Sequence, residues 1–246
     1  MTRIDKRKAD ELRPFTITPG FIPSADGSVL MECGHTRIIC TATAEDKVPP
    51  FRIESGLGWI HAEYGMLPGS TIKRKARPIL KQDGRSMEIQ RLIGRSLRSV
   101  ANMAALGERT ITVDCDVIEA DGGTRTASVT GGFVALVLAV GRLIEEGKIG
   151  KSPILDYVAA VSAGLVNGEA LLDLCYAEDS GAQADLNLVM TGTGGVVEVQ
   201  GTAEDGPFSR AQLDALLMLG EQGIQRLVQA QKQALGQNCC LVGGKA

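Results

Sequence analysis

One short segment of the chain carries the residue types that bind small anions: Asp121-Gly122-Gly123-Thr124-Arg125-Thr126. It follows an alternating run typical of a strand and precedes an apolar run typical of a helix, whose first N–H groups have no partner inside the helix. Two glycines remove side-chain obstruction, Arg125 offers a bidentate fork, and Thr124 or Thr126 offers a hydroxyl donor. These features predict a phosphate site, with a plain tight turn as the alternative that Gly-Gly before a helix more often indicates.

A second polar cluster, residues 178–185, lies between two apolar runs that each predict a strand. In this interpretation Asp179 ends one strand and Asp185 begins the next. If the strands are neighbours, both carboxylates lie at one sheet edge, where their oxygens suit Mg²⁺. The alternative is that the two acids only make a turn soluble, and for an isolated acidic pair this alternative is favoured.

Asp114 and Asp116 form a rival acidic pair, because alternation along residues 109–119 places them on one face of a predicted strand. Two like charges there are costly unless they are exposed or bonded to arginine. We expect them to pair with a basic helix rather than to take part in catalysis.

Basic residues are concentrated between residues 73 and 98. This segment holds nine lysines and arginines and two acids, a net charge of +7, whereas the whole chain carries −3 and the remainder therefore −10. Such polarity predicts one local site for a polyanion, and the alternative is a solvated face. No aromatic residue lies in the segment, so we expect sequence-independent contacts to RNA phosphates, not DNA. The candidates are Lys73, Arg74, Arg77, Arg91 and Arg95.

The elements that position these residues alternate between strands and helices. Residues 28–33 and 36–44 are predicted to form a hairpin of two strands, and residues 157–166 and 169–178 a second pair joined by a turn at Asn167-Gly168. Further strands are predicted at residues 58–64, 109–119, 186–190 and 196–201. Helices are predicted from residue 88, over 126–144 as a buried helix, and from Ser209 to about 234 with Gln212 as its capping-box partner. Residues 67–84 predict a surface loop.

Both halves run strands before a helix, and no low-complexity linker separates them, which predicts a single two-lobed α+β domain. We assign residues 1–235 to this domain and residues 236–246, which have no pattern, to a mobile C-terminal tail.

Composition excludes several classes of protein. A hydrophobic content of 44% supports a large core, and no window resembles a membrane span or a signal peptide, so we expect no membrane partner and a cytoplasmic location. Six cysteines without CxxC spacing and only two histidines argue against a zinc site and indicate free thiols.

Longer motifs surround the candidate residues. They lie at residues 58–68, 84–95, 114–117, 121–126, 178–180 and 198–204. In these motifs the chain, from about residue 12 to residue 234, resembles the ribonuclease PH family of phosphorolytic exoribonucleases, which trim tRNA.

The resemblance implies roles for particular residues. Arg85, Gly123, Thr124 and Arg125 would bind inorganic phosphate as co-substrate, and Asp179 and Asp185 would be the catalytic aspartates, with Mg²⁺ or Mn²⁺ on them. It also implies the two-lobed RNase PH fold, a homohexamer built as a trimer of dimers, and tRNA precursors with 3′ extensions as substrates. Gly69 stands where the family usually has a basic residue, which removes one RNA contact that neighbouring basic residues can replace.

Two other functions compete with this hypothesis. A non-catalytic subunit that threads RNA through an exosome-like ring would keep the fold, but such chains typically lose one half of the site, and this chain keeps both. A metal-dependent transferase acting on small molecules would leave the +7 segment unexplained.

Overall fold

The first sheet of the protein has five strands, in a computed structural model that describes residues 3–77 and 83–243. Their order in space is β1-β2-β3-β5-β4, and the neighbours are antiparallel except for the parallel pair β4–β5. The predicted hairpin is confirmed as β2 and β3. The bounds are β1 (Phe15–Pro19), β2 (Gly27–Cys33), β3 (Thr36–Glu45), β4 (Trp59–Met66) and β5 (Thr110–Glu119).

The second sheet has four antiparallel strands in the order β7-β6-β8-β9. The turn between β6 and β7 is the predicted Asn167-Gly168, whose φ angles of 51° and 79° are both positive, as a type I′ turn requires. The bounds are β6 (Val158–Val166), β7 (Glu169–Leu172), β8 (Ala184–Thr191) and β9 (Val196–Ala203).

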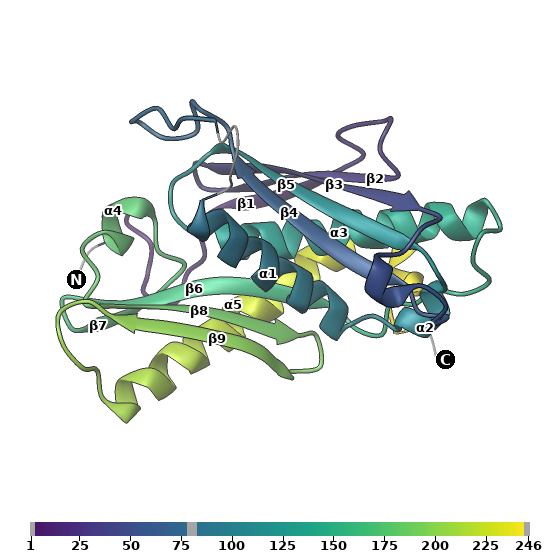
Figure 1. Ribbon diagram of the computed structural model, residues 1–246. Coiled ribbons are helices and arrows are strands. Elements are labelled where there is room, and N and C mark those ends of the chain that lie inside the picture. Colours follow the sequence, from purple (N-terminus) through teal and green to yellow (C-terminus); the bar gives the residue numbers. More distant parts are fainter. Residues whose placement is uncertain (1–2, 78–82, 244–246) are drawn as a thin grey trace.

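Helices lie between and against the two sheets. Helix α3 contacts strands of both sheets, and α5 packs on β6, β7 and β8 (Figure 1). The α+β class and the two-lobed plan are thereby confirmed. The helices are α1 (Gly84–Ser99), α2 (Met103–Leu106), α3 (Thr124–Glu145), α4 (Tyr176–Asp179) and α5 (Arg210–Leu235), with 3-10 turns η1 (Pro50–Arg52) and η2 (Gly236–Leu241).

Helix α3 forms the centre of the core. It is long and apolar enough to cross a membrane by length and composition, but 83% of its most apolar window is buried inside the protein. Such burial is typical of the core helix of a globular domain, so the predicted buried helix is confirmed.

Side-chain caps fix where two of the helices begin. The Asp83 side chain accepts a hydrogen bond from the N–H of Ser86, so α1 begins before the expected residue 88. Ser209 and Gln212 form the predicted capping box at the start of α5.

The predicted strand over residues 169–178 is wrong beyond Leu172. Asp173 has a positive φ of 53°, which breaks the strand, and a capping box between Cys175 and Glu178 then starts α4. The alternating leucines at 172 and 174 imitate a strand, but Asp173 between them is buried rather than exposed.

Residues 236–243 of the segment that we assigned to a C-terminal tail lie against the rest of the protein. Residues 236–241 form η2, and a Cβ added to Gly141 of α3 would lie 3.1 Å from the Leu241 side chain. Leu241 and Val242 pack against the main core. Hydrophobic contact therefore holds a segment that has no regular sequence pattern.

Candidate functional site

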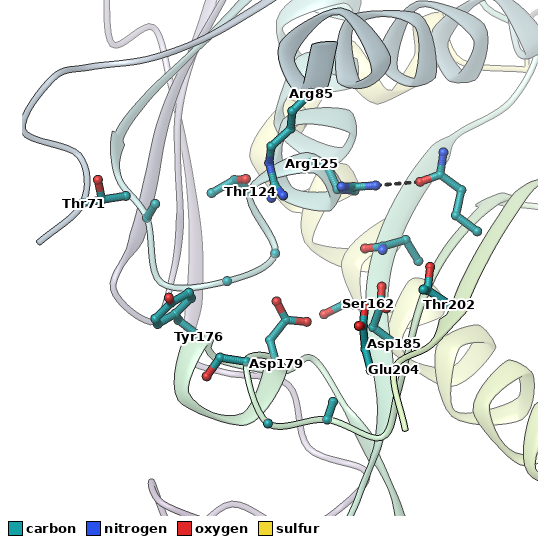
Figure 2. Close-up of a pocket in the computed structure, with 18 of the residues that line it drawn as sticks. Thr71, Arg85, Thr124, Arg125, Ser162, Tyr176, Asp179, Asp185, Thr202 and Glu204 are labelled. Atoms are coloured by element: carbon teal, nitrogen blue, oxygen red, sulfur yellow. Dashed lines mark hydrogen bonds between the residues drawn. The ribbon is translucent and has the colours of Figure 1, made fainter. Parts of the chain in front are cut away.

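A cavity of about 1450 Å³ lies between the two lobes. Its walls come from the loop after β4, the start of α1, the β5–α3 turn, α4 and strands β8 and β9. Figure 2 shows Arg85, Thr124 and Arg125 on one side of the cavity and Asp179 and Asp185 on the other. The structure thus brings the two separately predicted candidate sites together.

The glycine turn leads directly into α3. Gly122 and Gly123 have φ angles of 77° and 64°, and a Cβ on Gly122 would lie 2.7 Å from the carbonyl oxygen of Leu174. Only glycine fits such a conformation and such a close approach. Gly123 is the N-cap of α3 and provides no side-chain cap, so the first N–H groups of the helix remain available at the cavity wall. The predicted anion-binding geometry is therefore present.

Thr124, at the first position of α3, is held by a residue that the sequence did not single out. The buried Tyr64 of β4 donates its hydroxyl hydrogen to Thr124 Oγ1 over 2.9 Å. Burial raises the pKa of Tyr64 above its usual value, so the phenol stays protonated and remains the donor. The hydroxyl hydrogen of Thr124 is then free to face an anion.

Arg125 connects the phosphate turn to the second lobe. Its Nη1 donates to Gln200 Oε1 over 2.7 Å and lies 3.5 Å from Glu88 Oε1. Gln200 in turn donates to Glu88 and to Glu198. This network holds the Arg125 guanidinium at the cavity wall, with Glu88 as its ion-pair partner at 3.5 Å.

Arg85 lies in the first turn of α1 and also lines the cavity. Within residues 3–77 and 83–243, no hydrogen bond or ion pair engages its guanidinium. Burial raises the pKa of the Asp179 carboxyl, and the positive charge of Arg85 across the cavity opposes part of that rise. Arg85 is therefore available for an incoming anion.

The two aspartates reach the cavity from different elements. Asp185 lies in β8 as predicted, but Asp179 is the last residue of α4 and not the end of a strand. Burial raises the pKa of both carboxyls, and the charge of Asp179 raises that of Asp185 further, while Arg125 opposes the rise. Glu204, which also lines the cavity, acts in the same direction as burial.

The rival acids Asp114 and Asp116 lie elsewhere. Val113 and Cys115 of β5 pack toward α3, so alternation turns the two acids to the opposite face of the sheet. In the part of the chain that the structure describes, no ion pair joins either acid to an arginine of α1. The predicted pairing with the basic helix is wrong, because α1 packs on the other face of the sheet.

The predicted RNA contacts fall into two groups. Lys73 and Arg74 line the cavity, whereas Arg77 and Arg91 are exposed outside it. Arg95 makes a bidentate ion pair with Glu198 of β9, with a closest distance of 2.7 Å. Lys81, another residue of the basic segment, lies outside the described residues.

Comparison with protein-family models decides the family. Residues 11–140 match domain 1 of the 3′ exoribonuclease family, and residues 156–223 match domain 2. The chain belongs to this family. The two matches together cover most of the chain and include every residue assigned above to the two walls of the cavity.

Relatives within the family are close. The exoribonuclease is 57% identical over 231 residues to ribonuclease PH of Neisseria meningitidis serogroup C, a match that covers 93% of this chain and 96% of the relative. Ribonuclease PH of Neisseria gonorrhoeae is similar at the same identity and coverage. The expectation of a phosphorolytic 3′ exoribonuclease is thereby confirmed, and a non-catalytic ring subunit is the less supported alternative.

Solved structures confirm the fold. Rice Rrp46 superposes with a TM-score of 0.77 at 19% identity, covering 95% of this chain and 100% of that one. The Archaeoglobus fulgidus exosome with RNA bound to the active site gives 0.77 at 22% identity, covering 92% and 91%. At such identities the likeness shows the RNase PH fold alone.

Replacing Tyr64 by phenylalanine should raise the KM of the exoribonuclease for phosphate by about 3- to 10-fold, because one buried hydrogen bond of about 1 kcal/mol is lost and Thr124 can rotate. The kcat should change little. Steady-state kinetics at varied phosphate measure both constants. Tyr157→Phe, which removes a hydroxyl far from the cavity, is the matched control, and equal behaviour of the two variants contradicts the prediction.

Proposed function

We propose that the exoribonuclease trims the 3′ extensions of tRNA precursors and transfers each terminal nucleotide to inorganic phosphate, which releases nucleoside diphosphates. The observation that carries this proposal is one cavity with cationic and N–H groups on one wall and two carboxylates on the other. An anionic nucleophile and a developing negative charge are thus placed opposite each other.

The phosphate-binding wall positions the nucleophile. Arg85, Thr124, Arg125 and the N–H groups after Gly123 hold phosphate in line with the last phosphodiester. Phosphate is already an anion at neutral pH, so no base is needed to activate it. A phosphate oxygen forms a bond to phosphorus, and the bond from phosphorus to the 3′-oxygen of the preceding nucleotide breaks.

The carboxylate wall completes the reaction. Asp179 and Asp185 fit as two ligands of Mg²⁺ or Mn²⁺, because they face one cavity and repel each other's charge. When bound, the ion would also take oxygens of the substrate as ligands. Such an ion would neutralise charge that develops at the reacting phosphate. An aspartate with a raised pKa can also protonate the leaving 3′-oxygen.

RNA reaches this cavity past the basic loop. Lys73 and Arg74 lie at its wall and can bind the RNA backbone, with Arg77, Arg91 and Arg95 as further candidates outside it. Phosphate contacts of this kind do not read sequence. Selection of tRNA precursors would then depend on access of a free 3′ end.

Replacing Lys73 and Arg74 together by alanine should weaken RNA binding and flatten its salt dependence. Loss of two phosphate contacts reduces the slope of log K against log salt by about 1.4 for single-stranded RNA. Filter binding over a salt series measures the slope. Lys47→Ala with Lys151→Ala, at exposed sites outside the cavity, should leave it unchanged, and an equal change in both double variants rules out a local RNA site.

A 3′-extended tRNA tests the function as a whole. With phosphate, the exoribonuclease should release nucleoside diphosphates and stop near the mature 3′ end of the tRNA. Without phosphate it should release no nucleotides. Nucleoside monophosphates in both reactions would indicate a hydrolase. No product in either would favour the non-catalytic subunit, and equal shortening of an unstructured RNA and of the tRNA body would contradict the tRNA assignment.

We further propose a cytoplasmic homohexamer, arranged as a trimer of dimers. The family resemblance supports this assembly, and the solved structures with the same fold include exosome cores. Light scattering should give six times the 26.0 kDa mass of one chain. A monomeric mass at working concentration would contradict it.

A further inference from the structure

The segment before β1 places three arginine side chains, those of Arg3, Arg7 and Arg13, in the protein interior. Arg3 and Arg13 are 5% and 3% exposed, and each forms an ion pair with a buried acid, Glu178 and Asp173 respectively. We call these four residues the arginine clamp. Burial of several charges is costly, and paired buried charges are often no more stabilising than apolar side chains of the same volume. Stability alone therefore gives little reason for this arrangement.

One half of the arginine clamp holds helix α4. Arg3 binds Glu178 in a bidentate pair, with Nε–Oε1 and Nη2–Oε2 distances of 2.8 and 2.7 Å. The same guanidinium donates to the carbonyl oxygens of Leu172 and Asp173. Figure 1 shows the N-terminal segment beside α4, and α4 has only four residues, too few to keep its own orientation.

Glu178 directly precedes Asp179, which faces the cavity. The Glu178 carboxylate points inward to Arg3 and also accepts the N–H of Cys175, so both ends of α4 are tied to it. A rotation of α4 that moves Asp179 also moves the adjacent Glu178 and so displaces it from the bidentate pair with Arg3. The position of Asp179 therefore depends on Arg3.

The other half of the arginine clamp holds the phosphate turn. Arg13 binds Asp173 through Nε and Nη2 and donates through Nη1 to the carbonyl oxygen of Asp121. Asp121 accepts the N–H of Tyr176, and a Cβ on Gly123 would lie 2.9 Å from Arg13 Nη2. Arg13 thus lies directly behind the turn and joins it to the start of α4.

We propose that the arginine clamp positions the Asp179 carboxylate against the phosphate turn, with Arg3 and Glu178 as positioning residues for phosphorolysis. This inference rests on the proposed role of Asp179. The two walls of the cavity come from separate lobes, and the arginine clamp sets the distance between them. An error of about 1 Å in such a distance can reduce a rate about 100-fold.

The double variant Arg3→Met with Glu178→Gln tests the inference. It removes the Arg3–Glu178 pair without leaving an unpaired buried charge, because Arg7, which also lies 3.6 Å from Glu178, keeps Asp5 and Asp173 as partners. Glutamine can still accept the N–H of Cys175. We expect kcat to fall about 10- to 100-fold, while the KM for phosphate and the affinity for RNA stay within about twofold. Steady-state rates on a 3′-extended tRNA at varied phosphate give kcat and the KM for phosphate. Filter binding gives the RNA affinity, and thermal melting gives the folded fraction.

The matched control is Arg142→Met with Glu146→Gln, the same chemical change at an exposed pair between the last turn of α3 and its C-cap. It should behave like the unmodified protein. A clamp variant with unchanged kcat overturns the inference, and so does a loss of kcat that is fully explained by a smaller folded fraction at the assay temperature.

Asp179→Asn separates this inference from the function on which it rests. If Asp179→Asn retains full turnover, the catalytic assignment of Asp179 is wrong, and the positioning role of the arginine clamp fails with it. If Asp179→Asn is inactive and the double clamp variant is fully active, only the positioning role fails.

Discussion

Replacing Arg125 by alanine should raise the KM for phosphate by about 10- to 100-fold, because a hydrogen bond to a charged group contributes about 1.5–3 kcal/mol. Arg125 lines the cavity, and its guanidinium is held there by Gln200. RNA affinity should change about twofold or less, since the proposed contacts to the RNA backbone come from other basic residues. Initial rates at varied phosphate, and binding of RNA without phosphate, measure the two effects separately.

Arg95→Ala provides the control for Arg125. Both arginines bind polar side chains of β9 and so connect the two lobes, but Arg95 pairs with Glu198 outside the cavity. Arg95→Ala should leave the phosphate KM unchanged. Equal losses of phosphate use and RNA binding in Arg125→Ala contradict its assignment to the phosphate site.

Local sequence signals predicted the elements whose conformation depends on a few neighbouring residues. The Asn167-Gly168 turn, the Ser209 capping box and the glycine turn before α3 were all recognisable, because positive φ angles and unpaired helix N–H groups restrict the residue types that fit. The anion-site geometry belongs to this group.

Elements held by distant residues were not predictable in the same way. Asp173 breaks β7 because Arg13, 160 positions earlier, binds its carboxylate in the interior. Helix α4 similarly depends on Arg3. The alternation of residues 169–178 is typical of a strand, but the ion pair between Arg13 and Asp173 ends the strand at Leu172.

The site shows the same division. Its individual residues were recognisable from motifs, but the links between them were not: Tyr64 with Thr124, and Gln200 with Arg125, are separated by 60 and 75 positions. The +7 segment also divided in the structure, because Lys73 and Arg74 reach the cavity and Arg95 pairs with Glu198 instead. Charge counts predict a region, and only packing decides which charges remain available.

Replacing Asp185 by asparagine should reduce turnover by about 1000-fold or more while RNA still binds, because the proposed Mg²⁺ ligand and the charge that we place beside the reacting phosphate are both lost. Single-turnover assays with 3′-extended tRNA and parallel RNA binding measure the two properties. Asp214→Asn, an exposed aspartate on α5, is the matched control and should leave turnover unchanged. Retained turnover in Asp185→Asn rules out the catalytic role.

The same substitution should make the protein more stable at neutral pH. Burial and the nearby Asp179 raise the folded-state pKa of Asp185 above its usual 3.8, so the ionised carboxylate opposes folding at pH 7. Asparagine removes that cost. As pH falls through the raised pKa and then below 3.8, the carboxyl becomes protonated in both states and the difference in stability disappears. Thermal melting at neutral and acid pH measures this; a lower Tm for Asp185→Asn at pH 7 contradicts it, whereas an inactive variant with a higher Tm shows that Asp185 serves catalysis at the expense of stability.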